Sequence, residues 1–163
     1  MHDTVQTATK TPGQSRAVKV WDAPIRLIHW SIVLLVAFSY VTARQGWIEW
    51  HFLSGYTILA LVGFRIAWGI VGSDTARFSA FVRGPKAALQ HLSHVVRGKP
   101  EDEPGHNAAG GLMVLGLLGL LLFQAGTGLF SGDGIFVEGP LAQFVGGAMS
   151  ETITGWHGFG FDL

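Results

Sequence analysis

Long apolar segments alternate with polar stretches along the chain, and they predict three membrane-spanning helices. The segments cover about residues 25–43, 50–71 and 110–130. Each has roughly the 20 residues that a helix needs to cross a hydrocarbon core of about 30 Å. A fourth apolar stretch, 154–163, would cross only about half a bilayer as a helix. The pattern therefore predicts an all-α transmembrane four-helix bundle whose fourth helix is incomplete in this chain.

The polar segments predict a tail and a surface helix that lie outside this one bundle. Residues 1–19 lack the apolar core of a signal peptide, so we expect a flexible N-terminal tail. Residues 20–163 then form a single membrane bundle. In the long polar loop, an amphipathic stretch begins at Pro85 and ends at Gly98, which predicts a short cytoplasmic helix lying on the membrane surface.

The composition is typical of a membrane protein. Of the 163 residues, 48% are hydrophobic and 13% are charged, and the formal net charge is zero. A neutral chain has no electrostatic basis for binding nucleic acid, and we expect no such partner. The chain contains no cysteine. This excludes thiolate-bound iron–sulfur clusters and covalently attached haem.

The basic residues are distributed unevenly between the polar segments. Four lie before or at the start of the first span, five lie between the second and third spans, and none follows Lys99. The segments assigned to the other side carry Arg44 and several acidic residues. By the positive-inside rule, this predicts a multi-pass membrane protein with a cytoplasmic N-terminus.

Three histidines lie in the predicted spans and are candidate iron ligands. His29 is about one turn inside the first span, His51 begins the second, and His157 is near the start of the fourth. Imidazole is costly in lipid unless it has a partner, so histidines inside a membrane are functional candidates. Histidines on several helices of one bundle can hold a b-type haem. An interfacial position or ordinary packing is the alternative explanation for each of them.

The predicted depths of these histidines indicate two haems. His29 is near the inner end of its helix and His51 is near the outer end of the next, so they cannot bind one iron. His157 matches His51 in depth, and this pair could close one bis-histidine site. His29 would need a partner beyond Leu163.

The second span carries two more candidates on the face of His51. That face is predicted by steps of three and four residues from His51 to Gly55, Ile58, Val62, Arg65 and Gly69. Gly55 follows one turn later and leaves room for a flat macrocycle. Arg65 is about 21 Å from His51 along the helix axis. It should face a buried anion, such as a haem propionate, or the lipid headgroups. The glycines of the third span are best explained by close helix packing.

Four motifs resemble the bacterial cytochrome b561 family, which includes the cytochrome b subunits of nickel–iron hydrogenases and of formate dehydrogenase. They are VWDAPIRLIHW (Val20–Trp30), HFLSGY (His51–Tyr56), FRIAWGIVGSDTARFSAFVRGP (Phe64–Pro85) and GHNAAGGLMV (Gly105–Val114). The resemblance covers almost everything from Val20 onward. It implies four transmembrane helices in the bacterial inner (cytoplasmic) membrane and two b haems. His51 and His157 would ligate the outer haem, and His29 the inner one, whose second ligand in the family lies past Leu163.

The resemblance also implies electron exchange with a quinone near the inner haem. The segment Gly105–Gly110 corresponds to part of the quinone site in some relatives. Asn107 would hydrogen-bond a quinone carbonyl, His106 would exchange its proton, and Gly110 would allow close approach. Asn107 is also a candidate N-cap of the third helix.

These features favour an electron-transfer subunit over a self-standing enzyme. Electrons would pass between an outer-face redox partner, such as a hydrogenase-like subunit or a c-type cytochrome, and the quinone pool through two haems. One alternative is a superoxide:quinone oxidoreductase that acts alone, although the outer loops lack a basic entrance. Others are an anchoring subunit without a cofactor and a haem-free ion transporter that uses the histidines. The transporter should have acidic residues inside the membrane, which the first three spans lack.

Overall fold

The computed structural model describes residues 23–82, 84, 86 and 108–162. In chain order these residues form α1 (Ala23–Arg44), α2 (Ile48–Val71), α3 (Phe78–Phe81), α5 (Ala108–Phe130), the 3-10 helix η1 (Ala142–Phe144) and α6 (Gly147–Phe161). The predicted all-α bundle is confirmed. The predicted tail (1–19) and most of the predicted surface helix (85–98) lie outside the described residues.

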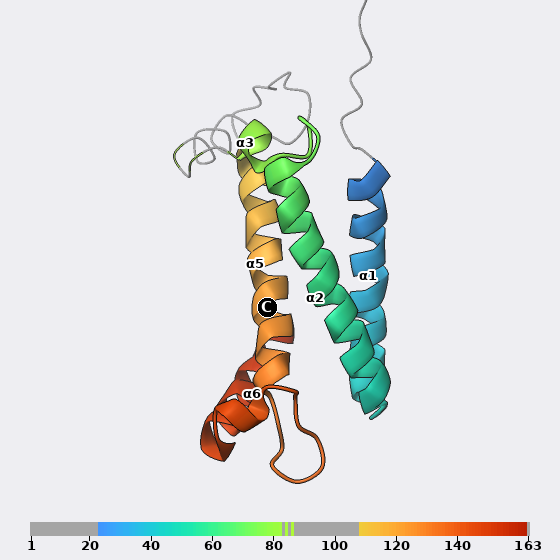
Figure 1. The fold of residues 1–163 in the computed structure, drawn as a ribbon, viewed down its shortest axis with the longest axis vertical. Coiled ribbons are helices and arrows are strands. Elements are labelled where there is room, and N and C mark those ends of the chain that lie inside the picture. The colour runs from blue at the N-terminus through green and yellow to red at the C-terminus, as the bar shows by residue number, and fades with distance from the viewer. Residues whose placement is uncertain (1–22, 83, 85, 87–107, 163) are drawn as a thin grey trace, which may run out of the picture.

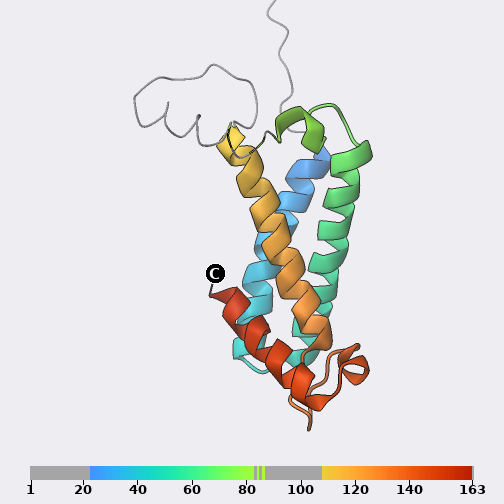
Figure 2. The ribbon, with the colours of Figure 1, turned by 90° about the vertical axis from the view of Figure 1, so that its left-hand side faces the viewer.

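The three long helices stand side by side, and α6 lies at one end of the bundle. In Figure 1, α1 and α5 run downward and α2 runs upward between them. Figure 2 shows α6 rising obliquely beside α5 from the lower end of the bundle, with its last turn about halfway up. The starts of α2 and α6 are therefore at the same end of the molecule, and the start of α1 is at the other.

A tight turn joins α1 and α2 into an antiparallel hairpin. Gly46 has a positive φ of 70°, which an L side chain rarely adopts. The backbone N–H of Trp47 donates to the carbonyl of Thr42 at 2.9 Å. The Thr42 side chain is fully buried, and its hydroxyl is within hydrogen-bond distance of the Phe38 and Ser39 carbonyls. The end of α1 is thus capped from within the hairpin.

The core lies where α2 meets α1 and α5. It is formed by Ile58, Val62 and Leu118, and Val62 is completely inaccessible. The buried face of α2 continues through Arg65 and Gly69, which is the helix face that the sequence predicts. Because lipid is as apolar as these side chains, close packing rather than removal from water holds such helices together.

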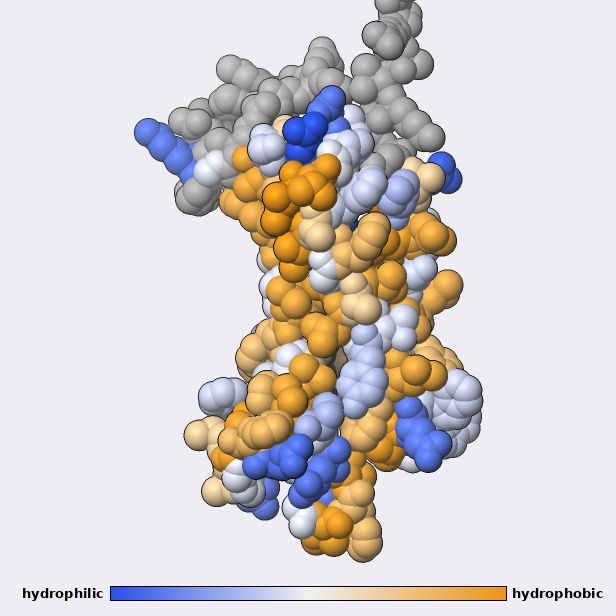
Figure 3. Space-filling model, in the orientation of Figure 1, coloured by the Kyte–Doolittle hydropathy of each residue, from blue (hydrophilic) through white to orange (hydrophobic). Residues whose placement is uncertain are grey.

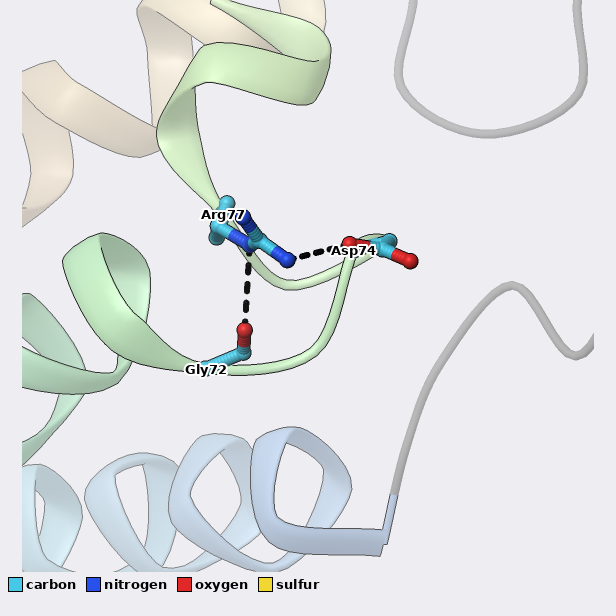
Figure 4. A network of polar contacts seen from close by, with 3 residues as sticks. All are labelled: Gly72, Asp74 and Arg77. Atoms are coloured by element: carbon cyan, nitrogen blue, oxygen red, sulfur yellow. Dashed lines mark hydrogen bonds and ion pairs between the residues drawn. The ribbon is translucent and has the colours of Figure 1, made fainter.

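The segment after α2 folds back across the ends of α2 and α5. In Figure 4, Arg77 pairs with Asp74 and donates through Nε to the Gly72 carbonyl at 3.1 Å. This ion pair is exposed, so it shapes the turn more than it stabilises the fold. The turn leads into α3, in which Phe81 is buried. A Cβ at Gly69 would overlap the Phe78 ring, so α3 can pack here only because that position is glycine.

α6 begins at Gly147, well before the predicted start near Thr154. The hydroxyl of Ser150 donates to the Phe130 carbonyl at 2.9 Å. The Thr154 hydroxyl lies 2.9 Å from the N–H nitrogen and 3.0 Å from the carbonyl oxygen of Gly132. Ser150 precedes the predicted fourth span, and Thr154 begins it. In the fold they are helical and bind the connection that follows α5.

Asp133 organises the tip of the connection between α5 and α6. Its Oδ1 accepts the backbone N–H groups of Ile135, Phe136 and Val137 at 2.9, 2.8 and 2.9 Å. These hydrogen bonds, that of Val137 foremost, favour the charged carboxylate and hold the pKa of Asp133 below its ordinary value.

The lowered pKa predicts that this turn loosens in acid. Its stabilisation is fully present above the pKa of the unfolded chain, about 3.9, and is lost as the pH falls through the lower folded pKa. At neutral pH, Asp133→Ala should accelerate hydrogen exchange of the amides at positions 135–137, because they lose their acceptor. Glu138→Gln, a charge change on the same loop, should leave that exchange unchanged. Equal exchange in Asp133→Ala and the wild type would contradict this account.

The surface of the bundle is apolar around its middle. α1, α2 and, from Ala109, α5 are each long and apolar enough to cross a membrane. Figure 3 shows apolar side chains over the waist of the molecule and hydrophilic ones gathered toward its two ends. Trp47, Trp50 and Trp156 are each more than half exposed. Such positions suit an aromatic belt at a membrane interface.

Candidate functional site

His51 lies in the first turn of α2, beside the last turns of α1. Its Nδ1 is 3.0 Å from the backbone carbonyl oxygen of Ser39 and 3.1 Å from the Ser39 hydroxyl. A carbonyl oxygen can only accept, so Nδ1 carries the proton in this contact. The imidazole lone pair is then on Nε2. This is the usual arrangement of a metal-binding histidine whose other nitrogen is held by a second group.

His157 lies in α6 and is held against α5 in the same way. Its Nδ1 is 2.9 Å from the backbone carbonyl oxygen of Gln124 and 3.2 Å from the Thr127 hydroxyl. The Gln124 side chain also donates through Nε2 to the backbone carbonyl of His157 at 2.9 Å. By the same argument, the Nε2 atom of His157 keeps its lone pair for a metal.

The two imidazoles meet although their helices do not. Their ring centroids are 6.0 Å apart and their planes are inclined by 75°. Within the described residues the backbones of α2 and α6 are not in contact, because α6 packs on α5 and η1. Two imidazoles that bind one metal from opposite sides, with metal–nitrogen bonds of about 2 Å, have ring centres about 6 Å apart. The observed separation therefore fits one shared metal ion.

The donor set fits haem better than a bare metal ion. In the described part of the chain, no group of three or more His, Asp or Glu residues could hold an ion. Two imidazoles alone leave a metal short of ligands, whereas a porphyrin supplies four nitrogens and needs only axial groups. A Cβ built at Gly55 would meet nothing within 4 Å, so the helix face after His51 is open. The residues present thus suit a flat macrocycle whose metal ion would be bound by both histidines.

Gly128 lets the His157 ring lie against α5. A Cβ at this position would be 2.9 Å from Cε1 and 3.4 Å from Nδ1 of His157. We predicted that the glycines of this helix serve helix packing. At Gly128 the nearest group is instead the imidazole. Packing does explain Gly111, where a Cβ would lie 2.7 Å from the Phe81 carbonyl oxygen.

His29 and Arg65 lie toward the opposite end of the bundle from this pair. His29 is exposed near the start of α1 and makes an edge contact with Trp30, with ring centroids 5.4 Å apart. Arg65 is only 8% exposed, and its guanidinium carbon is 4.8 Å from the centre of the Phe78 ring. Arg65 is therefore turned inward beneath α3, away from lipid.

The predicted quinone segment is only partly within the described residues. His106 and Asn107 lie outside them. Gly110 is half-buried at the start of α5, and the neighbouring Gly111 lies against the backbone of α3.

The sequence argument missed the residues that support the two imidazoles. They come from α1 and α5 and include Ser39, Gln124, Thr127 and Gly128. A signal was present on α5: Gln124 and Thr127 are polar residues three positions apart in an otherwise apolar helix, and so share a face. No such signal marks Ser39, which contributes mainly through its backbone.

Two comparisons relate the chain to known proteins. Residues 20–163 match the protein family described as prokaryotic cytochrome b561. The chain is 30% identical to the probable Ni/Fe-hydrogenase B-type cytochrome subunit of Azotobacter vinelandii, over an alignment that covers 88% of this chain and 74% of that protein. No solved structure matches the chain.

The chain belongs to the prokaryotic cytochrome b561 family. It is therefore a multi-pass membrane cytochrome of the b type that takes part in electron transfer. The apolar helices α1, α2 and α5 agree with this membership, since each is long enough to span a bilayer.

Proposed function

We propose that this cytochrome holds an outer haem b between His51 and His157 and an inner haem b at His29. It would carry electrons between a redox partner at the outer face and the quinone pool. The observation that carries the proposal is the 6.0 Å separation of two imidazoles whose Nδ1 atoms are both engaged by backbone carbonyls. A bound haem supplies the ferric/ferrous couple. The chain supplies ligation, orientation and shielding from water.

Other residues would position the two haems. Gly55 leaves open space on the helix face that follows His51. Arg65 is buried far from His51 on the same helix, where a cation would favour the propionates of the inner haem. The unequal distribution of basic residues supports an inner-membrane location with the N-terminus in the cytoplasm. The end of the bundle that carries His51 and His157 would then be the outer one.

The partners follow from the two ends of the molecule. The relative in Azotobacter vinelandii is named as a hydrogenase subunit, which supports a hydrogenase-like partner at the outer face. A c-type cytochrome is the second candidate. At the inner end, His106, Asn107 and Gly110 would bind a quinone beside the inner haem.

The visible spectrum of the purified full chain tests this function. We expect b-type Soret and alpha bands. By pyridine haemochrome assay we expect one haem per chain from the site between His51 and His157, and a second one when His29 has its partner ligand. A quinol should reduce the haem, and Asn107→Leu should slow that reduction without altering the bands. Colourless protein from cells supplied with haem precursor would refute the cytochrome assignment. Quinol reduction at the same rate in Asn107→Leu would refute the quinone site alone.

A further inference from the structure

Gln124 holds His157 at two points. Its backbone carbonyl oxygen is 2.9 Å from Nδ1 of the ring, and its side-chain Nε2 donates to the His157 carbonyl at 2.9 Å. One residue of α5 therefore fixes both the ring and the backbone of the proposed ligand. With the backbone of His157 held by the side chain of Gln124, the hydrogen bond at Nδ1 limits the rotation of the ring.

The Gln124 amide is poorly explained by stability alone. Its Oε1 is buried and accepts no hydrogen bond from any described residue. A buried acceptor left without a hydrogen bond carries a free-energy cost. Leucine, which is of similar size, would avoid that cost in an apolar helix. The benefit of the amide must therefore lie in what its Nε2 group does to His157.

We propose that Gln124 is a positioning residue that sets the plane and basicity of His157, and through them the reduction potential of the outer haem. This inference rests on the proposed function, because it requires His157 to be an iron ligand. When a backbone carbonyl accepts a hydrogen bond from Nδ1–H, the imidazole becomes a stronger electron-pair donor to the metal through Nε2. A stronger axial donor stabilises ferric iron, which lowers the potential.

Gln124→Leu tests this inference because it leaves the backbone acceptor in place and removes only the side-chain contact. The His157 backbone would shift from α5, and the hydrogen bond at Nδ1 would lengthen. We expect the outer haem to be retained and its ferric/ferrous equilibrium to move about threefold to tenfold toward the ferrous form, a rise of about 30–60 mV. The electron paramagnetic resonance spectrum of the ferric haem should change as well, since it depends on the angle between the two imidazole planes, which is 75° here.

Ser150→Ala is the matched control. The Ser150 hydroxyl also ties α6 to a backbone carbonyl of α5, that of Phe130 at 2.9 Å, but it does not contact His157. We expect this variant to keep the wild-type potential and spectrum. If Gln124→Leu does not accumulate, Gln124→Asn keeps an amide but shortens the side chain by one methylene, which withdraws the same donor, and the same shift is expected.

The results distinguish a failure of the Gln124 role from a failure of the haem assignment. Wild-type potential and spectrum in Gln124→Leu or Gln124→Asn would overturn the role of Gln124 while leaving the haem assignment intact. Equal shifts in Ser150→Ala and Gln124→Leu would also overturn it, because general contact between α5 and α6 would then be the cause. Absence of haem from the wild-type chain would remove the proposed function itself.

Discussion

His51→Ala will yield a protein without the outer haem, because the site loses one of its two iron ligands. The remaining imidazole of His157 cannot complete axial coordination alone, and nothing else among the described residues replaces the lost ring at 6.0 Å. We expect the haem content to fall by one equivalent in a pyridine haemochrome assay on the purified variant. Any haem bound at His29 should stay, since that residue is near the start of α1, at the other end of the bundle (Figure 1).

Two companion variants make this result specific. The double variant His51→Ala/His157→Ala should lose no more haem than either single variant, because the two residues share one site and their effects cannot add. His29→Ala should keep the outer haem. Full haem stoichiometry in His51→Ala would show that this histidine is not a ligand.

Gly128→Ala will displace His157 and lower the affinity for the outer haem on the order of tenfold or more. This is a typical effect of disturbing the groups that support a metal ligand. The added Cβ would lie 2.9 Å from Cε1 of the ring, closer than real Cβ contacts allow. Relief requires movement of the ring or of α6, and either would stretch the hydrogen bond from Nδ1 to the Gln124 carbonyl. Haem titration of the apoprotein measures the loss.

Gly126→Ala is the matched control on the same helix. A Cβ at Gly126 would meet nothing within 4 Å, so haem binding should stay at the wild-type level. The two substitutions add the same methyl group to α5 two residues apart. Equal haem affinity in the two variants would mean that the ring does not depend on the space at Gly128.

The spans could be predicted from the sequence because hydrophobicity along a helix is a local property. Residues 25–43 and 50–71 lie within or close to α1 and α2, and the predicted face of α2 that carries Ile58 and Val62 is its buried face. The start of α6 was placed too late. Its first turns contain Ser150 and Thr154, whose hydroxyls bind a distant connection. A local pattern cannot reveal partners that only folding supplies.

By itself, the sequence determined the apolar helices, the absence of cysteine and the presence of histidines at matching depths. Those features limit the chemistry to a membrane protein with imidazole ligands, because length and composition decide what can reside in lipid. Only the tertiary structure decided that α6 packs on α5 rather than on α2, and that the ring centroids of His51 and His157 are 6.0 Å apart. It also decided that the backbone carbonyls of Ser39 and Gln124 accept hydrogen bonds from the Nδ1–H groups of these rings. Backbone carbonyls occur at every residue, so the sequence does not show which of them will face an imidazole. The crossing of the helices selects them.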